Sequence, residues 1–139
     1  MRIIGFDFTK ISIEQLKDVS ELKEQLKIST QIDVPELTEI KSHLLKTKEE
    51  LVKAKFVYGV DYNPDFAKIE LEGRILISVE PKVAKEIFKQ WKKKKMPEDF
   101  RMLLFNAILK KSSLKALHLE EELNLPLHMP MPSFKKEQK

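Results

Sequence analysis

Residues 51–79 read LVKAKFVYGVDYNPDFAKIELEGRILISV, and this stretch decides the fold. Apolar side chains alternate along both of its halves, which is the pattern of β-strands with one buried face. The cluster Asn63-Pro64-Asp65 separates the halves, and these residue types favour a tight reversal of the chain. The sequence therefore predicts a long antiparallel hairpin. Its alternating residues are Val52, Ala54, Phe56, Tyr58, Val60 and Tyr62 on the first arm, and Ala67, Ile69, Leu71, Gly73, Ile75, Ile77 and Val79 on the second.

Another strand is predicted at the start of the chain, where the apolar residues change parity. Ile4, Phe6 and Phe8 have one parity, whereas Ile11 and Ile13 have the other. A β-bulge inserts one extra residue into a strand, so a bulge near Thr9-Lys10 would bring both sets to one face.

A second strand is predicted at residues 26–34, from the alternation of Leu26, Ile28, Ile32 and Val34. We expect Pro35 to stop this strand, because proline cannot donate to a central ladder. Pro35 could also begin a short helix, since Leu37, Ile40, Leu44 and Leu45 recur at near-helical spacing.

Helical periodicity follows the hairpin. One amphipathic helix is predicted to begin near Pro81, with Val83, Ile87, Phe88 and Trp91 on its apolar stripe. A longer helix is predicted to begin at Pro97, with Glu98 and Asp99 in the first turn, where the helix dipole favours acids. Its expected buried stripe is Phe100, Leu103, Leu104, Ala107, Ile108 and Leu114, and residues 119–123 are expected to add a helical turn or two.

The end of the chain is rich in proline. Pro126, Pro130 and Pro132 alternate with apolar residues, which excludes a helix or a central strand and predicts an extended segment. The predicted fold is therefore α+β: a four-stranded antiparallel sheet with a long helix packed on one face and an extended Pro-rich C-terminal segment. We expect one domain over residues 1–134 and a disordered basic tail at residues 135–139.

Composition excludes several classes of protein. The chain has 139 residues, 42% of them hydrophobic and 35% charged, which is too apolar for disorder and too charged for a membrane protein. It contains no apolar run of about 18 residues, so no membrane insertion is expected. The absence of cysteine excludes disulfides and thiolate metal sites. No signal peptide is recognisable at the start, so a cytoplasmic location is expected. The abundance of lysine and glutamate resembles the composition of thermophilic proteins.

The usual signatures of enzymes are missing from the sequence. No glycine-rich loop is present, and His43, His118 and His128 lie in different segments without metal-ligand spacing. Ser112-Ser113 is interpreted as a helix end or turn, and no carboxylate falls at an apolar position where burial would tune its acidity. We therefore expect no catalytic residue, no cofactor and no metal site.

A lysine cluster offers one candidate for function. Lysines at 82, 85 and 89 and the run Lys92-Lys93-Lys94-Lys95 would attract a polyanion such as RNA. The alternative interpretation is a solvated helix end, which is favoured because base recognition usually needs arginine and exposed aromatic rings, whereas Phe88 and Trp91 fall on the apolar stripe. The candidate nucleic-acid-binding residues are Lys89, Lys92, Lys93, Lys94 and Lys95.

Apolar surface offers a second candidate. One helix can cover only one face of a sheet, yet both parities of the hairpin carry apolar residues at Leu51, Val57, Phe66 and Leu76. A second subunit or an apolar ligand could cover them, or they could simply complete the core.

Short motifs along the chain resemble those of SecB-type export chaperones. The segment Phe8-Thr9-Lys10-Ile11-Ser12-Ile13-Glu14 is similar to the family's Lys-x-Ile-Ser-Phe-Glu signature. Residues 68–73 resemble the family strand that runs into a glycine, and the helix after Pro97 resembles the long family helix. The endings Leu123-Asn124-Leu125-Pro126-Leu127 and Pro130-Met131-Pro132-Ser133-Phe134 are similar to the family's Leu-Asn-Leu-x-Pro-x-x-Phe.

This resemblance implies an ATP-independent holdase that binds non-native polypeptides in apolar grooves, and a homo-oligomer that is a dimer or a dimer of dimers. The chain is basic and ends in lysines, whereas bacterial members use an acidic face and tail to dock a motor ATPase. The resemblance therefore favours an antitoxin-linked or archaeal SecB-like protein, and the alternative is a basic RNA- or ribosome-associated protein. The implied polypeptide-binding residues are Phe56, Tyr58, Trp91, Leu127, Met129 and Met131.

Overall fold

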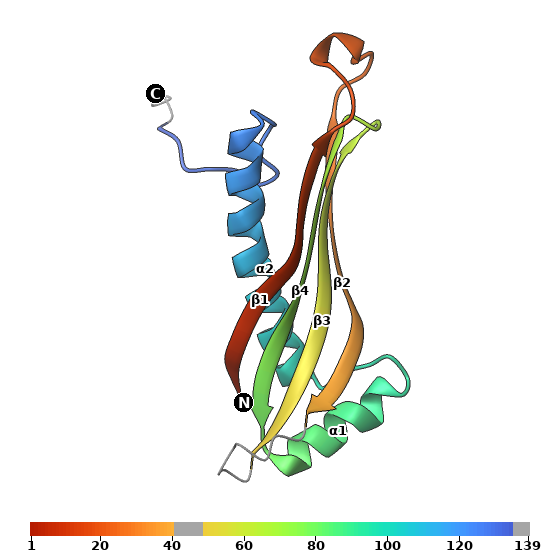
Figure 1. Cartoon of the computed structure of the whole chain (residues 1–139), viewed down its shortest axis with the longest axis vertical. Coiled ribbons are helices and arrows are strands. Elements are labelled where there is room, and N and C mark those ends of the chain that lie inside the picture. Colours follow the sequence, from red (N-terminus) through yellow and green to blue (C-terminus); the bar gives the residue numbers. More distant parts are fainter. Residues whose placement is uncertain (41–48, 135–139) are drawn as a thin grey trace, which may run out of the picture.

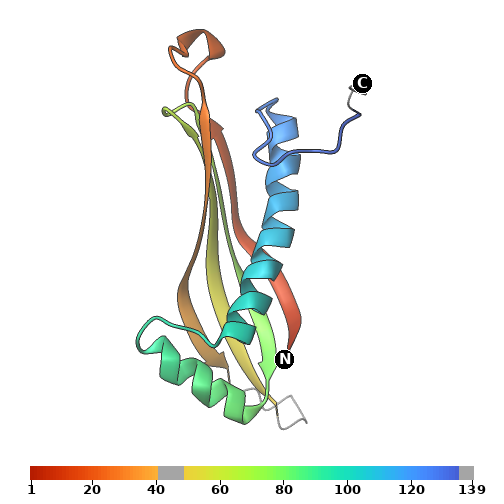
Figure 2. The ribbon, with the colours of Figure 1, turned by 180° about the vertical axis from the view of Figure 1, so that it is seen from behind.

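The computed structural model describes residues 1–40 and 49–134. A four-stranded antiparallel sheet has the order β1-β4-β3-β2. Two helices, α1 (Pro81–Trp91) and α2 (Glu98–Glu122), lie on one face of this sheet (Figures 1 and 2). The predicted α+β fold is confirmed, and the predicted basic tail at 135–139 lies outside the described residues. The strands are β1 (Arg2–Gln15), β2 (Lys27–Ile40), β3 (Glu50–Asn63) and β4 (Ala67–Val79).

The predicted hairpin is the centre of the sheet. β3 and β4 pair in continuous register from Glu50 opposite Val79 to Tyr62 opposite Ala67. Its alternating residues form the inner face and are buried under the helices, because each strand places every second side chain on the same side. Position 73 on this face requires glycine: an added Cβ would lie 2.5 Å from the Asp7 carbonyl oxygen and 2.6 Å from the Phe56 ring. The ring of Phe56 packs there against Phe6 and Phe8.

A bulge in β1 confirms the predicted change of parity. The register with β4 shifts between Phe8 and Lys10, so Phe8 pairs with Gly73 and Ile11 with Leu71 on the same inner face. A second shift between Ile3 and Gly5 was not predicted. It removes Ile4 from the inner face and leaves it exposed.

Two predictions for residues 35–45 are wrong where the structure describes them. β2 does not stop at Pro35 but continues to Ile40, and residues 35–40 are strand rather than helix. Pro35 lies within a register shift between Asp33 and Glu36, on a strand at the edge of the sheet. Edges and bulges tolerate proline because no ladder hydrogen bond is lost there. The rest of the expected helix, including Leu44 and Leu45, lies outside the described residues.

The long helix α2 is continuous over 25 residues and does not end near Ser112. The predicted position of Ser112-Ser113 is therefore wrong, because both serines are buried in the middle of the helix. The buried residues recur every fourth position, and such a row turns about 40° around the helix per step. Leu114 is 62% exposed, which contradicts its assignment to the buried stripe. The row of buried residues is Phe100, Leu104, Ile108, Ser112, Ala116 and Glu120.

The outer face of the sheet is predominantly polar. Cross-strand ion pairs join Lys10 to Glu70 at 3.3 Å and Arg74 to Asp7 at 3.1 Å. Of the two alternatives for the second apolar face of the hairpin, completion of the core holds for Leu51 and Phe66, which are buried within the single chain, whereas Val57 and Leu76 are half-buried. Large exposed apolar side chains occur on β1, in the connection after it, on α2 and on the C-terminal segment.

Candidate functional site

A buried polar network joins the sheet, the last turns of α2 and the C-terminal segment. Tyr58 and Tyr62 contribute their hydroxyl groups from β3, Ser113 and Glu120 contribute from α2, and His128 contributes from the segment after α2. The Glu120 carboxylate has no exposed surface, and the imidazole of His128 is 1% exposed. Burial of a carboxylate is costly unless its oxygens accept hydrogen bonds.

Glu120 meets that requirement through three donors. His128 Nδ1 lies 2.6 Å from Glu120 Oε1, and the backbone N–H of His128 donates to Oε2 at 3.0 Å. The hydroxyl of Tyr62 has a single proton, which is shared between Oε2 and the Pro126 carbonyl oxygen, 2.7 Å away. Hydrogen bonds to a charged group are stronger than neutral ones, so Glu120 is the centre of the network.

One arrangement of protons satisfies the remaining groups. If Nδ1 of His128 carries the proton donated to Glu120, Nε2 accepts from the Tyr58 hydroxyl at 2.8 Å. The Tyr58 oxygen then accepts from Ser113 at 3.2 Å. The neighbouring Ser112 hydroxyl is buried without a hydrogen-bond partner among the described residues.

Both tyrosines hold their protons more tightly than usual. Burial raises the pKa of Tyr58, and the negative charge of Glu120 raises it further. Burial also raises the pKa of Tyr62, and so does its hydrogen bond to Glu120. The two hydroxyl groups therefore remain neutral hydrogen-bonding groups above the pH at which an ordinary tyrosine ionises.

The chain reaches this network through a sharp reversal after α2. Asn124 has the left-handed φ of 53°, which asparagine tolerates better than most residues. Asn124 N–H donates to the Glu121 carbonyl at 3.2 Å, and Leu125 N–H donates to the Glu120 carbonyl at 2.9 Å. This pair of bonds is a Schellman motif, which caps the helix and directs the following residues back along it.

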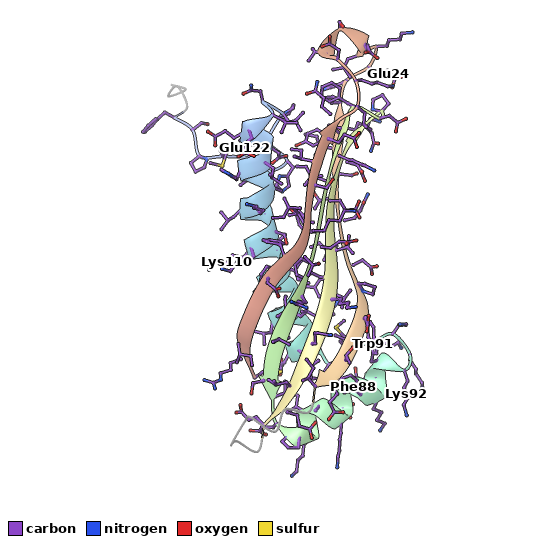
Figure 3. The ribbon with its side chains drawn as sticks, in the orientation of Figure 1. Glu24, Phe88, Trp91, Lys92, Lys110 and Glu122 are labelled. Atoms are coloured by element: carbon purple, nitrogen blue, oxygen red, sulfur yellow. The ribbon has the colours of Figure 1, made fainter. Side chains whose placement is uncertain are left out.

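The residues implied as polypeptide-binding do not form one surface. Phe56 and Tyr58 are each 1% exposed and belong to the core. Trp91 is half-buried at the end of α1, in the lower part of Figure 3, whereas Glu122 lies at the upper end of α2. Leu127, Met129 and Met131 lie beyond that end of α2 and are exposed. Their role in binding remains a prediction, and in the single chain only the last three present a largely exposed apolar side chain.

An open hollow of about 480 Å³ lies beside the C-terminal segment. Its polar rim comes from the last turns of α2, and its apolar surface comes from both the helix and the segment. The lining residues are Leu117, His118, Glu121, Asn124, Leu125, Leu127 and Met131.

Exposed apolar side chains also occur at several points along α2. Met102, Leu109 and Leu114 are exposed, and Phe105 is half-buried. No other described element packs over Leu114, which is the most exposed of these helix residues. Large exposed apolar residues along one helix commonly mark an interaction surface.

The lysine cluster is exposed on α1 and in the turn that follows it. Lys89 and Lys92 border a hollow of about 430 Å³ that also contains Glu39 and Glu50. Lys94 Nζ lies 4.5 Å from the centroid of the Trp91 ring, a cation–π contact. This contact occupies one face of the only tryptophan, so that face is covered by a lysine rather than open for stacking on a base.

In the part of the chain that the structure describes, no helix is long and apolar enough to cross a bilayer. No group of three or more histidine, aspartate or glutamate side chains is arranged to hold a metal ion among residues 1–40 and 49–134.

Comparison with solved structures shows a likeness in fold. The chain superposes on the Mycobacterium tuberculosis Rv1957 SecB-like chaperone, solved with a ChAD peptide from the Rv1956 HigA1 antitoxin, with a TM-score of 0.53. The fold is SecB-like. The two chains are 10% identical, and the match covers 95% of this chain and 90% of that chain. No family model and no curated protein sequence matches the chain.

The sequence patterns did not predict the buried polar network. The expectation that no carboxylate is buried is wrong for Glu120. One signal could have revealed Glu120: it continues the every-fourth row that begins at Phe100, so it occupies a core position at the end of α2. His128 gave no comparable signal because it follows a chain reversal.

Proposed function

We propose that this chain is a SecB-like holdase that binds extended, non-native polypeptides without ATP. The observation that carries the proposal is the SecB-like fold together with exposed apolar side chains along α2 and on residues 127–131. Apolar contact is non-directional and depends mainly on buried area, so it suits clients of varied sequence. Methionine adds an adaptable side chain, and Met129 and Met131 supply it here.

The proposal includes self-association. A single chain leaves Met102, Leu109 and Leu114 exposed along α2, and a second copy would bury them. The apolar residues 127–131 would then remain for clients. A closed oligomer that buries both sets of apolar side chains would be a structural assembly rather than a holdase. Sedimentation combined with titration of a hydrophobic dye distinguishes the closed oligomer from the holdase, because the closed oligomer binds little dye.

Suppression of aggregation tests the proposed activity. A chemically denatured client is diluted into buffer with a stoichiometric amount of the protein, and light scattering is followed at low and high salt. We expect suppression at both salt concentrations and without nucleotide, since apolar contact is not screened by salt. Unchanged scattering in both buffers would reject the holdase proposal.

Substitutions on the C-terminal segment provide a matched comparison. Met129→Ser combined with Met131→Ser removes two exposed apolar side chains, and we expect weaker binding by about tenfold for each side chain that a client buries. Val19→Ser is the control, because Val19 is 65% exposed but lies in the connection between β1 and β2. If the double variant binds the client as tightly as the Val19→Ser control does, the C-terminal segment is not part of the binding surface.

A second candidate function is binding of RNA through the lysine cluster. It is favoured by the exposed lysines 92–95 in the turn between α1 and α2. This candidate predicts an affinity that falls linearly with salt on a log–log plot and falls further when these lysines become glutamine. An affinity independent of these substitutions would exclude it.

A further inference from the structure

Residues 126–128 are held partly by their backbone. The Pro126 carbonyl oxygen lies 2.7 Å from the Tyr62 hydroxyl, and the His128 N–H lies 3.0 Å from a Glu120 carboxylate oxygen. These two backbone groups are present in nearly every polypeptide, whatever its sequence. Recognition of extended peptides elsewhere relies in the same way on main-chain hydrogen bonds for affinity and on pockets for side-chain preference.

The neighbouring apolar surface has the form such a site requires. Leu125 is buried, while Leu127 and Met131 line the hollow formed with Leu117 on α2. An extended apolar segment thus lies beside the last turns of α2 with its backbone fixed and part of its side-chain surface exposed. In the segment that occupies the site, apolar residues stand at every second position from 125 to 131.

We infer that Tyr62 and Glu120 form a clamp for the backbone of an extended polypeptide, and that the chain's own residues 126–128 occupy it until a client replaces them. This inference rests on the proposed holdase function and adds a site and a means of regulation to it. The His128 imidazole strengthens the internal occupant, because it bonds to both Glu120 and Tyr58. A client must displace this occupant, so the free protein has a reduced apparent affinity.

Residue-resolved hydrogen exchange on the unmodified full-length protein tests the inference. The client is reduced and alkylated α-lactalbumin, which is permanently unfolded. At saturation with this client we expect exchange of the His128 amide to accelerate by at least about tenfold, since its bond to Glu120 is broken. The Leu125 amide is the internal control, because it bonds to the Glu120 carbonyl in the helix cap and lies outside the clamp.

The outcomes separate the two proposals. If the client binds and the His128 amide keeps its protection, the clamp inference is wrong and the holdase function stands. If the client does not bind, the proposed function fails and the clamp inference fails with it. Acceleration at His128 with an unchanged Leu125 supports both.

A variant tests the same inference by relieving the internal occupant. Binding of a fluorescent peptide with the sequence of residues 124–134 is measured by anisotropy to the full-length protein and to its His128→Ala variant. We expect about tenfold tighter binding to the variant, because the clamp is more often vacant. Lys110→Ala is the control, since Lys110 is exposed on α2 and lies outside the residues that line the hollow. Equal affinities of the two variants would overturn the inference; if His128→Ala does not fold, the exchange measurement decides.

Discussion

The most informative perturbation of the buried network is Tyr62→Phe. It removes one hydroxyl group and leaves the fully buried ring in place, so the loss of stability reports on hydrogen bonding rather than on packing. That hydroxyl is one of three donors to the Glu120 carboxylate. Hydrogen bonds to charged groups contribute about 1.5–3 kcal/mol, and we expect the free energy of unfolding to fall by that amount.

Tyr58→Phe is the matched control. Tyr58 is also buried on β3, but its hydroxyl contacts the neutral Ser113 hydroxyl and the His128 ring rather than the carboxylate. An ordinary hydrogen bond contributes about 1 kcal/mol, so this variant should be less destabilised than Tyr62→Phe. Urea unfolding followed by far-UV circular dichroism measures both, at one protein concentration because self-association would shift the midpoint. With an m-value of about 2 kcal/mol/M, Tyr62→Phe lowers the midpoint by about 1 M.

A double-mutant cycle with Glu120→Gln isolates the interaction. Once the charge of Glu120 is removed, Tyr62→Phe should cost less than it does in the unmodified protein, by about 1 kcal/mol. A cost that is identical in both backgrounds, or a Tyr62→Phe variant no less stable than Tyr58→Phe, would refute the view that Glu120 is the centre of the network.

Three further predictions concern the fold and its ionisable groups. Because Tyr58 and Tyr62 are the only tyrosines and both have a raised pKa, tyrosinate absorbance at 295 nm should stay absent as the native protein is brought to about pH 10. Their contribution to stability is complete below the unfolded pKa and declines as pH rises above it, so a reversible titration with an ordinary midpoint in the folded protein would contradict the burial of these hydroxyl groups. Gly73→Ala should lower the free energy of unfolding by about 1–3 kcal/mol, whereas Gly5→Ala, whose Cβ would meet only Leu76 at 3.5 Å, should cost much less; similar urea midpoints for the two variants would argue against the close approach at Gly73. Replacement of Arg74 by Met should cost no more than about 1 kcal/mol in thermal unfolding, because its ion pair with Asp7 is exposed to solvent, and a larger loss would assign this pair a structural role that its exposure does not suggest.

Much of the sheet could be predicted because strand alternation is a local pattern. The hairpin, the bulge after Phe8 and both helix starts follow from period and from proline position. The continuation of β2 through Pro35 could not be predicted, since it depends on β2 lying at the edge of the sheet. That position is decided by the pairing of distant strands rather than by the residues next to Pro35.

The candidate site was less accessible to sequence reasoning. The network joins residues separated by up to 70 positions, as in the contact of Tyr58 with His128. Glu120 lies in a charged helix end and looks like an ordinary surface glutamate in the sequence. It is buried because the row of buried residues, one at every fourth position, turns gradually around α2 and reaches Glu120 at its end. The prediction that Leu114 is buried was wrong for the same reason. It assumed that the buried side of α2 keeps one direction along the whole helix, whereas that side turns around the helix axis.

A titration of the unmodified protein with reduced and alkylated α-lactalbumin tests the central claim most directly. Fluorescence anisotropy of the labelled client is recorded at low and high salt, with native α-lactalbumin as the control. The account predicts saturable binding of the unfolded client that changes little with salt, and no binding of the native protein. Absence of binding to the unfolded client, or binding that disappears at high salt, would contradict it.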